Sequence, residues 1–462
     1  MAQRRVLAAV IVAAAALFTV HMADLSLPSL EDAFYAREAV EMERAGRFYT
    51  VTWNELPTHQ HPPLQIWLVG RSFALFGEND FAARLPTVLM ALGLILLAYR
   101  LGAHLVGSAA ALTGIACLLA TPLFVDNARR LMMEVPLTFW ITLTILLFVE
   151  GRERPWLHAL LGLPLGAAIL TKSVLGLMPL WVFVGALVCP DLRRAWRRPW
   201  IWLGIALGLA FGVSWPVQQA LSQGLATVRF HYVTFVVGRS TGRWGVLPLL
   251  FGYPLILLKF YQPIVLPGVL GALLVLRRCG LRHPAVLLAA WVLVPIALCS
   301  LSSFRTPRFL FPILPALALC AGYGLAETFP RAAARLAWPV VPVGALAVAV
   351  VIWVAPSLLP LDPNAGFKRG AALLRTEIPE HETVPYLGNR YWSTANPLLY
   401  YTERALERSS PSAAAAIQLA RRSRAHLLLC DRSRLAEVRV LGVPFAIVLE
   451  DPQWLLIRVP PV

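Results

Sequence analysis

Charged residues are scarce in this chain: only 14% of its 462 residues are Asp, Glu, Lys or Arg, whereas 58% are hydrophobic. In a soluble globular domain about a quarter of the residues are charged. Because one membrane-spanning helix needs roughly 20 mostly apolar residues, the chain has enough apolar sequence for many spans. The composition therefore excludes a soluble protein and indicates an integral membrane protein with many spans and one modest soluble domain.

Acidic residues are fewer than basic ones, with 25 Asp and Glu against 41 Lys and Arg and a formal net charge of +16. An excess of this size is typical of nucleic-acid binding when the basic residues form one continuous patch. Here they stand in short clusters between apolar runs, so the charge excludes a nucleic-acid partner and indicates membrane topology.

Cysteine is rare too, and the six cysteines lack the spacing of metal ligands. Most of them fall inside apolar runs, where a free cysteine behaves as a small hydrophobic residue. We therefore expect them to be buried: Cys117, Cys189, Cys279, Cys299, Cys320 and Cys430.

Long apolar runs, by contrast, are abundant. The first follows Met1 to Arg5 as in a signal peptide, but a small-residue cleavage site is missing, so we expect a retained signal anchor. Eleven runs have spanning length and predict about eleven transmembrane helices: 5–23, 82–105, 107–125, 134–150, 156–173, 174–190, 201–221, 258–276, 283–301, 308–326 and 337–356.

Basic connectors predict the orientation, because cytoplasmic loops retain Lys and Arg. With the N-terminus inside, the other strongly basic connectors also fall inside: Arg152, Arg154, Arg193, Arg194, Arg197, Arg198, Arg277, Arg278, Arg331 and Arg335. An odd number of spans puts the C-terminal segment outside. We expect a multi-pass protein of the cytoplasmic membrane whose outer face carries the loops 24–80, 124–133, 222–257 and 302–307.

Two kinds of element are expected outside the spans. Segments 31–45 and 63–77 mix apolar residues with charge and predict short helices lying at the membrane interface. In the C-terminal segment, a helix-like stretch at 413–424 is followed by strand-like runs at 426–429, 445–449 and 454–459. We therefore predict two domains: a transmembrane domain over 1–358 and a small extracytoplasmic α/β domain over 359–462. Since no nucleotide-binding glycine loop precedes a helix there, we assign it no catalysis.

Three acids on the expected outer side are candidate catalytic residues. Glu31 and Asp32 are adjacent just beyond the first span, where they either cap the helix 33–45 or carry chemistry. Glu134 opens the fourth span, where it either pairs with Arg129 or Arg130 or joins the first two acids. In the second interpretation, acids from two outer loops converge to bind an acceptor and deprotonate its nucleophile.

The same side also carries cations that the orientation rule does not require. Lys172 is the most informative of them. Inserting a Lys within a span into the membrane costs roughly 2.5–3.5 kcal/mol, so its charge needs a partner, and an anionic lipid phosphate is a suitable one. For cations near helix ends the alternative is snorkelling to the interface. The candidate phosphate-binding residues are His61, Arg84, Lys172, Arg239, Arg243, Arg305 and Arg308.

Several short motifs, in order, resemble one family: the GT-C membrane glycosyltransferases that include protein O-mannosyltransferases and the aminoarabinose transferases of lipid A. Glu31 to Ala36 resembles their Asp-Glu-x-x-Tyr-Ala opening, and His61-Pro62-Pro63-Leu64 with Trp67 resembles Lys-Pro-Pro-Leu-x-x-Trp. The other matching pieces are Phe76-Gly77, Ala83-Arg84-Leu85-Pro86, Met133-Glu134-Val135-Pro136-Leu137, Leu170-Thr171-Lys172-Ser173 for Leu-Thr-Lys-Gly, and Arg308-Phe309-Leu310-Phe311-Pro312 with Leu314-Pro315-Ala316. The resemblance covers roughly residues 5 to 330.

Three positions depart from the pattern of the family. Asp is usual where this chain has Glu31 and Glu134, and Lys is usual where it has His61. A longer carboxylate still acts as a base, but histidine is only partly charged near neutral pH, so a phosphate contact is less secure at His61 than at Lys172.

The resemblance implies a GT-C fold and an inverting transfer of a sugar from a polyprenyl-phosphate donor. Glu31 would be the general base on an acceptor hydroxyl, Asp32 and Glu134 would orient the acceptor or the base, and the cations would stabilise the departing phosphate. The acceptor could be lipid A, another glycolipid, a cell-envelope glycan or a protein. A divalent metal is left open, with His59, His61 and His231 on the outer side.

Three rival functions belong to other classes. A transporter or flippase for lipid-linked glycans predicts internal repeats and broken helices around a mid-membrane site, and no second half of this sequence echoes the first. A polymerase or ligase of lipid-linked glycans would share the donor chemistry but not the early pair of acids. A non-catalytic assembly protein would not release polyprenyl phosphate.

Overall fold

The structure is a computed structural model that describes residues 2–27, 31–46, 48–238, 246–330, 362, 364–379, 382–389, 391–407 and 410–461. The chain forms two compact units. The first consists of Met1–Val20, His59–Leu68 and Arg84–Val354, and the second of His21–Thr58, Val69–Ala83 and Ala355–Val462. The second unit thus combines part of the expected first outer loop with the C-terminal segment, and the boundary near residue 358 stays a prediction.

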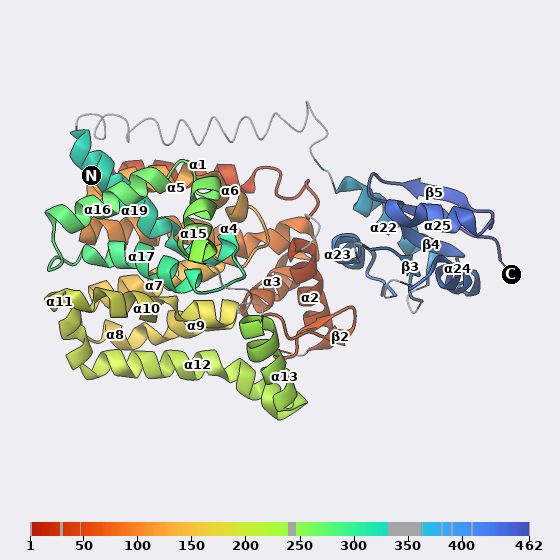
Figure 1. Ribbon diagram of the computed structural model, residues 1–462, viewed down its shortest axis with the longest axis horizontal. Coiled ribbons are helices and arrows are strands. Elements are labelled where there is room, and N and C mark those ends of the chain that lie inside the picture. The colour runs from red at the N-terminus through yellow and green to blue at the C-terminus, as the bar shows by residue number, and fades with distance from the viewer. Residues whose placement is uncertain are drawn as a thin grey trace. The chain divides into compact units, whose positions relative to one another are not determined.

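The first unit is built from helices (Figure 1). Long apolar stretches interrupted by Gly and Pro form them, and short 3-10 turns connect several of them. Their bounds are α1 (Ala2–Thr19), α4 (Asp80–Leu105), α5 (Ser108–Leu119), α6 (Pro122–Ala128), α7 (Glu134–Glu150), α8 (Leu157–Leu160), α9 (Gly162–Lys172), η1 (Ser173–Leu177), α10 (Met178–Gly185), η2 (Ala186–Val188), α11 (Pro190–Arg193), η3 (Arg194–Arg197), α12 (Pro199–Gln223), α13 (Leu225–Arg229), the π-helix η4 (Phe230–Val237), α15 (Val246–Phe260), α16 (Val265–Arg278), α17 (Val286–Ser300), α18 (Pro307–Leu310), η5 (Phe311–Ile313) and α19 (Leu314–Thr328).

Small residues allow these helices to pack closely, as is common in membranes. Helices α9 and α12 lie side by side (Figure 1). A Cβ added at Gly204 of α12 would lie 2.0 Å from the carbonyl oxygen of His158, and one at Gly162 would lie 2.4 Å from the carbonyl oxygen of Gly204. No larger residue fits at either position, so the two backbones touch there.

Four helical stretches among the described residues are long and apolar enough to cross a membrane: Asp80–Leu105, Leu157–Val188, Pro199–Gln223 and Pro307–Thr328. Two bent pairs would raise the number to six, namely Ser108–Leu119 with Pro122–Ala128, bent by 74°, and Phe251–Phe260 with Val265–Arg278, bent by 120°. The expectation of a multi-span, mostly helical protein is confirmed, whereas the count of eleven stays a prediction.

Individual spans differ in their outcome. Helices cover 82–105, 201–221 and 308–326 as predicted, and 156–173 and 174–190 belong to one stretch of 32 residues. The predicted span 258–276 was wrong, since α15 ends at Phe260 and α16 begins only at Val265. Pro263 in this break has no N–H to donate and disfavours helix in the residue before it. The predicted span 337–356 lies outside the described residues.

The second unit mixes helices and strands. The predicted helices 31–45 and 63–77 are confirmed as α2 (Glu31–Ala45) and α3 (Leu64–Phe76), of which α3 begins in the first unit. A short hairpin, β1 (Thr52–Trp53) with β2 (Leu56–Pro57), follows α2. The remaining elements are α22 (Ala365–Glu377), β3 (Tyr386–Leu387), α23 (Tyr391–Thr402), α24 (Ala413–Arg422), β4 (Leu427–Asp431), η6 (Arg432–Arg434), α25 (Leu435–Val440), β5 (Ala446–Glu450) and β6 (Trp454–Arg458).

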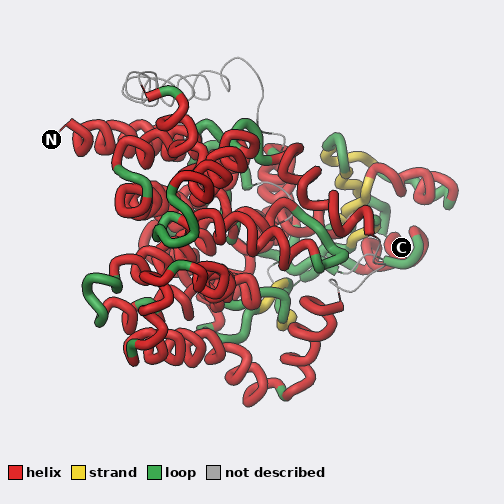
Figure 2. The backbone as a smooth tube through the Cα atoms, turned by 60° about the vertical axis from the view of Figure 1, so that its left-hand side comes forward, coloured by secondary structure: helices red, strands yellow, loops and turns green. Residues whose placement is uncertain are grey.

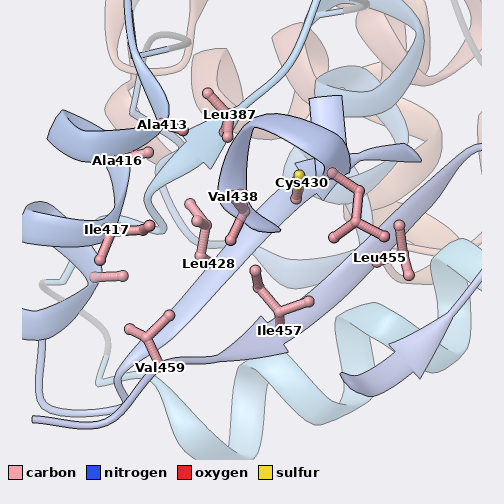
Figure 3. Packing of buried hydrophobic residues seen from close by; sticks show 12 residues of the cluster. Leu387, Ala413, Ala416, Ile417, Leu428, Cys430, Val438, Leu455, Ile457 and Val459 are labelled. Atoms are coloured by element: carbon pink, nitrogen blue, oxygen red, sulfur yellow. The ribbon is translucent and has the colours of Figure 1, made fainter. Parts of the chain in front are cut away.

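A four-stranded sheet of order β3-β4-β6-β5 organises the C-terminal part of this unit. Strands β4, β5 and β6 and helix α24 lie where the sequence predicted them, whereas β3 was not predicted. Figure 2 shows the strands in yellow with helices beside them. Strand β4 pairs in parallel with β3 and antiparallel with β6. All five residues of β4 are buried, as in a strand covered on both faces. Leu428 and Ile457 pack with Ile417 of α24 and Val438 of α25 in one apolar cluster (Figure 3).

All six cysteines are free, as expected. Cys189, Cys299, Cys320 and Cys430 are buried, and Cys117 and Cys279 are half-buried.

Candidate functional site

A buried ion pair joins two helices of the first unit. Glu134 is the first residue of α7 and Lys172 the last residue of α9, and Lys172 Nζ lies 2.6 Å from Glu134 Oε1. The side chains are 2% and 16% exposed. Because taking two charges out of water costs about as much as their attraction returns, such a pair is weak evidence for a purely stabilising role.

Glu134 does not pair with its neighbours in sequence, so that interpretation was wrong. Arg129 instead donates from its guanidinium to the carbonyl oxygens of Leu17 and Val20, at 2.9 and 2.7 Å. Arg130 lies 3.4 Å from Asp126, one helical turn earlier. Glu134 is buried, and the cations that act on it among the described residues, Lys172 and Arg308, are distant in sequence.

A second cation acts on the same carboxylate. Arg308, in the short helix α18, interacts electrostatically with Glu134. Glu134 Oε2 is buried and accepts no hydrogen bond from the part of the chain that the structure describes. The first unit therefore brings together three of the predicted site residues, Glu134, Lys172 and Arg308. The second carboxylate oxygen of Glu134 has no hydrogen-bond donor among the described residues and is available to one from a bound molecule.

The end of α9 fixes the direction of Lys172. Ser173 has φ of 49° and ψ of −122°, so the helix cannot continue through it. Its hydroxyl lies 3.1 Å from His231 Nε2, and His231 Nδ1 lies 2.7 Å from the backbone oxygen of His59. Sequence reasoning listed His231 only as an outer-side histidine and missed this contact, because residues 58 apart in sequence share no local pattern.

Glu31 and Asp32 form the first turn of α2, in the second unit. Their position fits the helix-terminus interpretation, because acids are favoured at a helix N-terminus. Asp32 is fully buried and Glu31 is half-buried. Since these acids and the Glu134–Lys172 pair belong to different units, their convergence stays a prediction.

Further along α2, two more acids are buried that sequence reasoning did not single out. Arg37 Nε lies 2.5 Å from Glu41 Oε1, and Arg37 Nη1 donates to the carbonyl oxygen of Leu399. Glu38 is fully buried and accepts a hydrogen bond of 2.8 Å from the hydroxyl of Thr58. Burial raises the pKa of the Glu38 carboxyl well above its ordinary value, and the nearby Glu41 acts in the same direction. The spacing of Arg37 and Glu41, four residues apart, was the available signal.

The other predicted cations have different surroundings. Arg84 is buried and lies close enough to Arg129 to repel it electrostatically. Arg305 packs against Gly252, where an added Cβ would lie 2.7 Å from Arg305 Cδ. His61 is half-buried, and Arg239 and Arg243 lie outside the described residues.

Metal binding has no further support from geometry. Within the described ranges, no three His, Cys, Asp or Glu side chains are grouped so that they could hold a metal ion.

The chain shares its fold with membrane sugar transferases of the GT-C class. It aligns with the crystal structure of ArnT from Cupriavidus metallidurans bound to undecaprenyl phosphate, with a TM-score of 0.79 and 18% identity over 99% of this chain and 98% of the other. An oligosaccharyltransferase of Archaeoglobus fulgidus aligns with a TM-score of 0.61 and 13% identity over 93% of this chain and 68% of the other.

Within this class, residues 60–216 match the sequence model of the dolichyl-phosphate-mannose-protein mannosyltransferase family, so the chain contains a domain of that family. The undecaprenyl phosphate-alpha-4-amino-4-deoxy-L-arabinose arabinosyl transferase of Pseudomonas aeruginosa (strain LESB58) is 27% identical over 349 residues, which are 71% of this chain and 61% of the relative. An uncharacterized protein of Aquifex aeolicus is 32% identical over 148 residues, 31% of this chain and 30% of that protein. The predicted relationship is confirmed, although the chain spans only 61% of the length of the arabinosyl transferase.

Proposed function

We propose that this protein transfers a sugar from a polyprenyl-phosphate donor to a lipid, glycan or protein acceptor at the outer face of the cytoplasmic membrane. The observation that carries the proposal is the buried Lys172–Glu134 pair with Arg308 beside it. The relatives support the donor class, since one is named for an undecaprenyl-phosphate-linked sugar and another was crystallised with undecaprenyl phosphate.

On the donor side, Lys172 and Arg308 bind the lipid phosphate. Lys172 is 16% exposed and Arg308 is half-buried, so each attracts an anion more strongly than it would at the open surface. As the bond from the sugar to the phosphate breaks, negative charge grows on the departing phosphate, and cations fixed in advance stabilise that charge. Arg84, Arg305 and His61, with Arg239 and Arg243, are further candidates for the same anion.

On the acceptor side, Glu31 acts as the general base. It takes the proton of the acceptor hydroxyl, the oxygen forms a bond to the anomeric carbon, and the bond from that carbon to the phosphate oxygen breaks. The electron pair of the broken bond leaves with the polyprenyl phosphate, so one displacement inverts the anomeric configuration. Asp32 and Glu134 orient the acceptor or the base, and no covalent sugar-enzyme intermediate is formed.

In the proposed topology this chemistry takes place at the outer face of the cytoplasmic membrane. The N-terminus lies in the cytoplasm, the chain crosses the inner membrane about eleven times, and the α/β domain of residues 359–462 is extracytoplasmic. Nucleotide sugars are cytoplasmic, so a lipid-linked donor is the form in which a sugar reaches this face.

The test is a transfer assay with purified protein and an undecaprenyl-phosphate sugar, following release of undecaprenyl phosphate. Glu31→Gln should lower the rate about a hundredfold to ten-thousandfold, the usual contribution of a general base. Glu43→Gln is a matched control, because Glu43 lies on the same helix and pairs with Arg71 at the surface. A Glu31→Gln variant as fast as wild type would disprove the base assignment. Movement of intact lipid-linked sugar across a bilayer without cleavage would show a transporter instead.

A further inference from the structure

The junction of α9 and η1 has an unusual backbone. Ser173 adopts a φ of 49°, which costs free energy for a residue other than glycine. The Leu-Thr-Lys-Gly motif that residues 170–173 resemble has glycine at this position, and glycine adopts positive φ without this cost. Here something else must hold the break in the helix.

Close packing holds the break from one side. Gly176 in η1 lies against α9, where an added Cβ would be 2.3 Å from the backbone nitrogen of Ile169. The turn after Lys172 therefore folds back onto the preceding helix with no space for a side chain at Gly176.

His231 holds the break from the other side. Its Nδ1 must carry a proton, because the backbone oxygen of His59, 2.7 Å away, only accepts hydrogen bonds. In the neutral ring Nε2 is then the acceptor, and the hydroxyl of Ser173, 3.1 Å away, donates to it. The hydroxyl of Tyr232 is also hydrogen-bonded to Ser173.

The surroundings keep His231 in one orientation and uncharged. The side chain is buried, and its ring meets that of Trp215 edge to face at 5.0 Å between centroids. Burial lowers the pKa of His231; the hydrogen bond to the backbone oxygen of His59 acts in the opposite direction, and the charge of the His59 ring lowers the pKa again. A ring with a fixed tautomer and a fixed orientation offers Ser173 an acceptor at one place only.

We propose that His231 is a positioning residue, which through Ser173 maintains the break after α9 and so directs the amine of Lys172 toward Glu134 and the donor phosphate. The backbone of Lys172 is itself part of the break, with φ of −148° and ψ of 42°, so a helical conformation at this residue would start its side chain in another direction. The approach of the amine to Glu134 therefore depends on the break. The inference rests on the proposed function, because it concerns how Lys172 is aimed at the lipid phosphate.

Two substitutions separate the two contacts of His231. Asn keeps a donor near the position of Nδ1 for the oxygen of His59 but is too short to reach Ser173, whereas Gln reaches Ser173 with its amide and gives up the contact with His59. Binding of undecaprenyl phosphate to the full chain in nanodiscs is the measurement. His231→Asn should weaken binding about five- to thirtyfold, the effect of one broken buried hydrogen bond, and His231→Gln less than about threefold.

A second background tests whether the effect passes through Ser173. In a chain that carries Ser173→Gly, the positive φ no longer needs support, so adding His231→Asn should change the affinity less than about twofold. A merely structural role for His231 predicts the same loss in both backgrounds. His158→Asn is the control for general destabilisation, since His158 is another buried histidine, whose hydrogen bond among the described residues is to the backbone oxygen of Phe148.

Three results would be decisive. Equal losses for His231→Asn with Ser173 and with Gly at position 173 would overturn the inference, and so would a His231→Gln variant as weak as His231→Asn. Wild-type protein that neither binds undecaprenyl phosphate nor releases it from a donor would contradict the proposed function itself.

Discussion

Lys172 and Glu134 illustrate how a single residue is placed by its partner. Replacing Lys172 by Met leaves the Glu134 carboxylate buried without its hydrogen bond of 2.6 Å. Removing one member of a buried pair typically costs about 3–5 kcal/mol, whereas replacing both with neutral groups is often nearly neutral. We therefore expect Lys172→Met to lower thermal stability strongly, and the double variant Lys172→Met with Glu134→Gln to recover most of the loss.

Thermal unfolding in detergent checks this prediction, with binding of undecaprenyl phosphate measured in parallel. Both variants should bind the lipid phosphate poorly, since both lack the ammonium group. A double variant as unstable as the single one would show that the pair is not the electrostatic unit that its distance indicates.

Glu38 gives a prediction for pH. Its pKa is raised in the folded protein, chiefly by burial, so between the ordinary value of 4.5 and the raised value the folded state binds a proton that the unfolded state does not. Stability from this group is present at low pH and falls as pH rises through that window. Glu38→Gln keeps a partner for the hydroxyl of Thr58 and removes the titration.

The measurement is the unfolding temperature from pH 4.5 to pH 8 for wild type and variant. We expect Glu38→Gln to flatten part of the decline with rising pH and to be the more stable protein at the alkaline end. Glu43→Gln, on the same helix but in a surface pair with Arg71, should leave the slope as it is. A slope that is unchanged by Glu38→Gln would contradict the assignment.

For single residues, the sequence predicts which charged side chains stand in unusual positions, but it does not predict which residues they contact. Glu134 and Lys172 both stand out, as an acid and a base at the ends of apolar runs, yet they are 38 residues apart in sequence and their contact follows from the packing of α7 against α9. Glu38 did not stand out, because a Glu within a charged amphipathic helix is usually solvated, and only the covering chain makes it buried.

Among the helices, the contact of α9 with α12 depends on glycine more than on apolar surface. In a membrane, lipid tails are as apolar as Leu, so helices associate through close packing. Gly204→Val would place Cβ 2.0 Å from the carbonyl oxygen of His158 and force α8 or α9 away from α12. Overpacking of this kind costs about 1–3 kcal/mol or more.

Ala206→Val is the matched control, because it adds a similar volume on the exposed face of the same helix. Gly204→Val should lower the unfolding temperature and reduce donor binding, since α9 ends in Lys172, and Ala206→Val should do neither. If the two substitutions lowered stability and donor binding equally, the cause would be the volume added to α12, and the contact of α12 with α9 would have no special role.

Elements were predicted well where periodicity is strong and poorly where the chain bends. Strands β4 to β6 and helices α2, α3 and α24 form where alternating or helical patterns indicated them. The break between α15 and α16 was missed because residues 258–276 are apolar enough to span, and hydropathy gives no weight to Pro263. Similarly, Ser173 reads as an ordinary helix residue until its φ is known.

For the molecule as a whole, the C-terminal segment is bonded to the loop that precedes the proposed base. The backbone N–H of Leu27 donates to the hydroxyl of Tyr401 at 2.7 Å, and Ser26 donates from its hydroxyl and its N–H to Asp362. These contacts lie within the second unit, which also contains α2 with Glu31 and Asp32. A segment assigned no catalysis thus holds the chain just before the first turn of α2.

Tyr401→Phe tests this coupling with the smallest change available. The hydroxyl of Tyr401 accepts from Leu27 and donates to Asp80 at 2.9 Å. Its removal takes this bond from the N–H of Leu27 and from Asp80, which keeps its ion pair with Lys368. An unmet buried hydrogen bond costs about 1–3 kcal/mol, which is enough to loosen the loop while the sheet stays folded. We expect transfer to slow about tenfold, with donor binding retained because Lys172 and Arg308 belong to the other unit.

Tyr400→Phe, at the adjacent residue whose ring stacks on Phe73, is the control. Faster amide exchange at Leu27 in Tyr401→Phe, with full exchange protection in β4, would separate a loosened loop from an unfolded domain. If Tyr401→Phe transfers sugar at the rate of Tyr400→Phe while Leu27 exchanges faster, the loop before α2 does not position Glu31. The base would then have to be sought among acids that the C-terminal segment does not hold, with Glu134 the first to test.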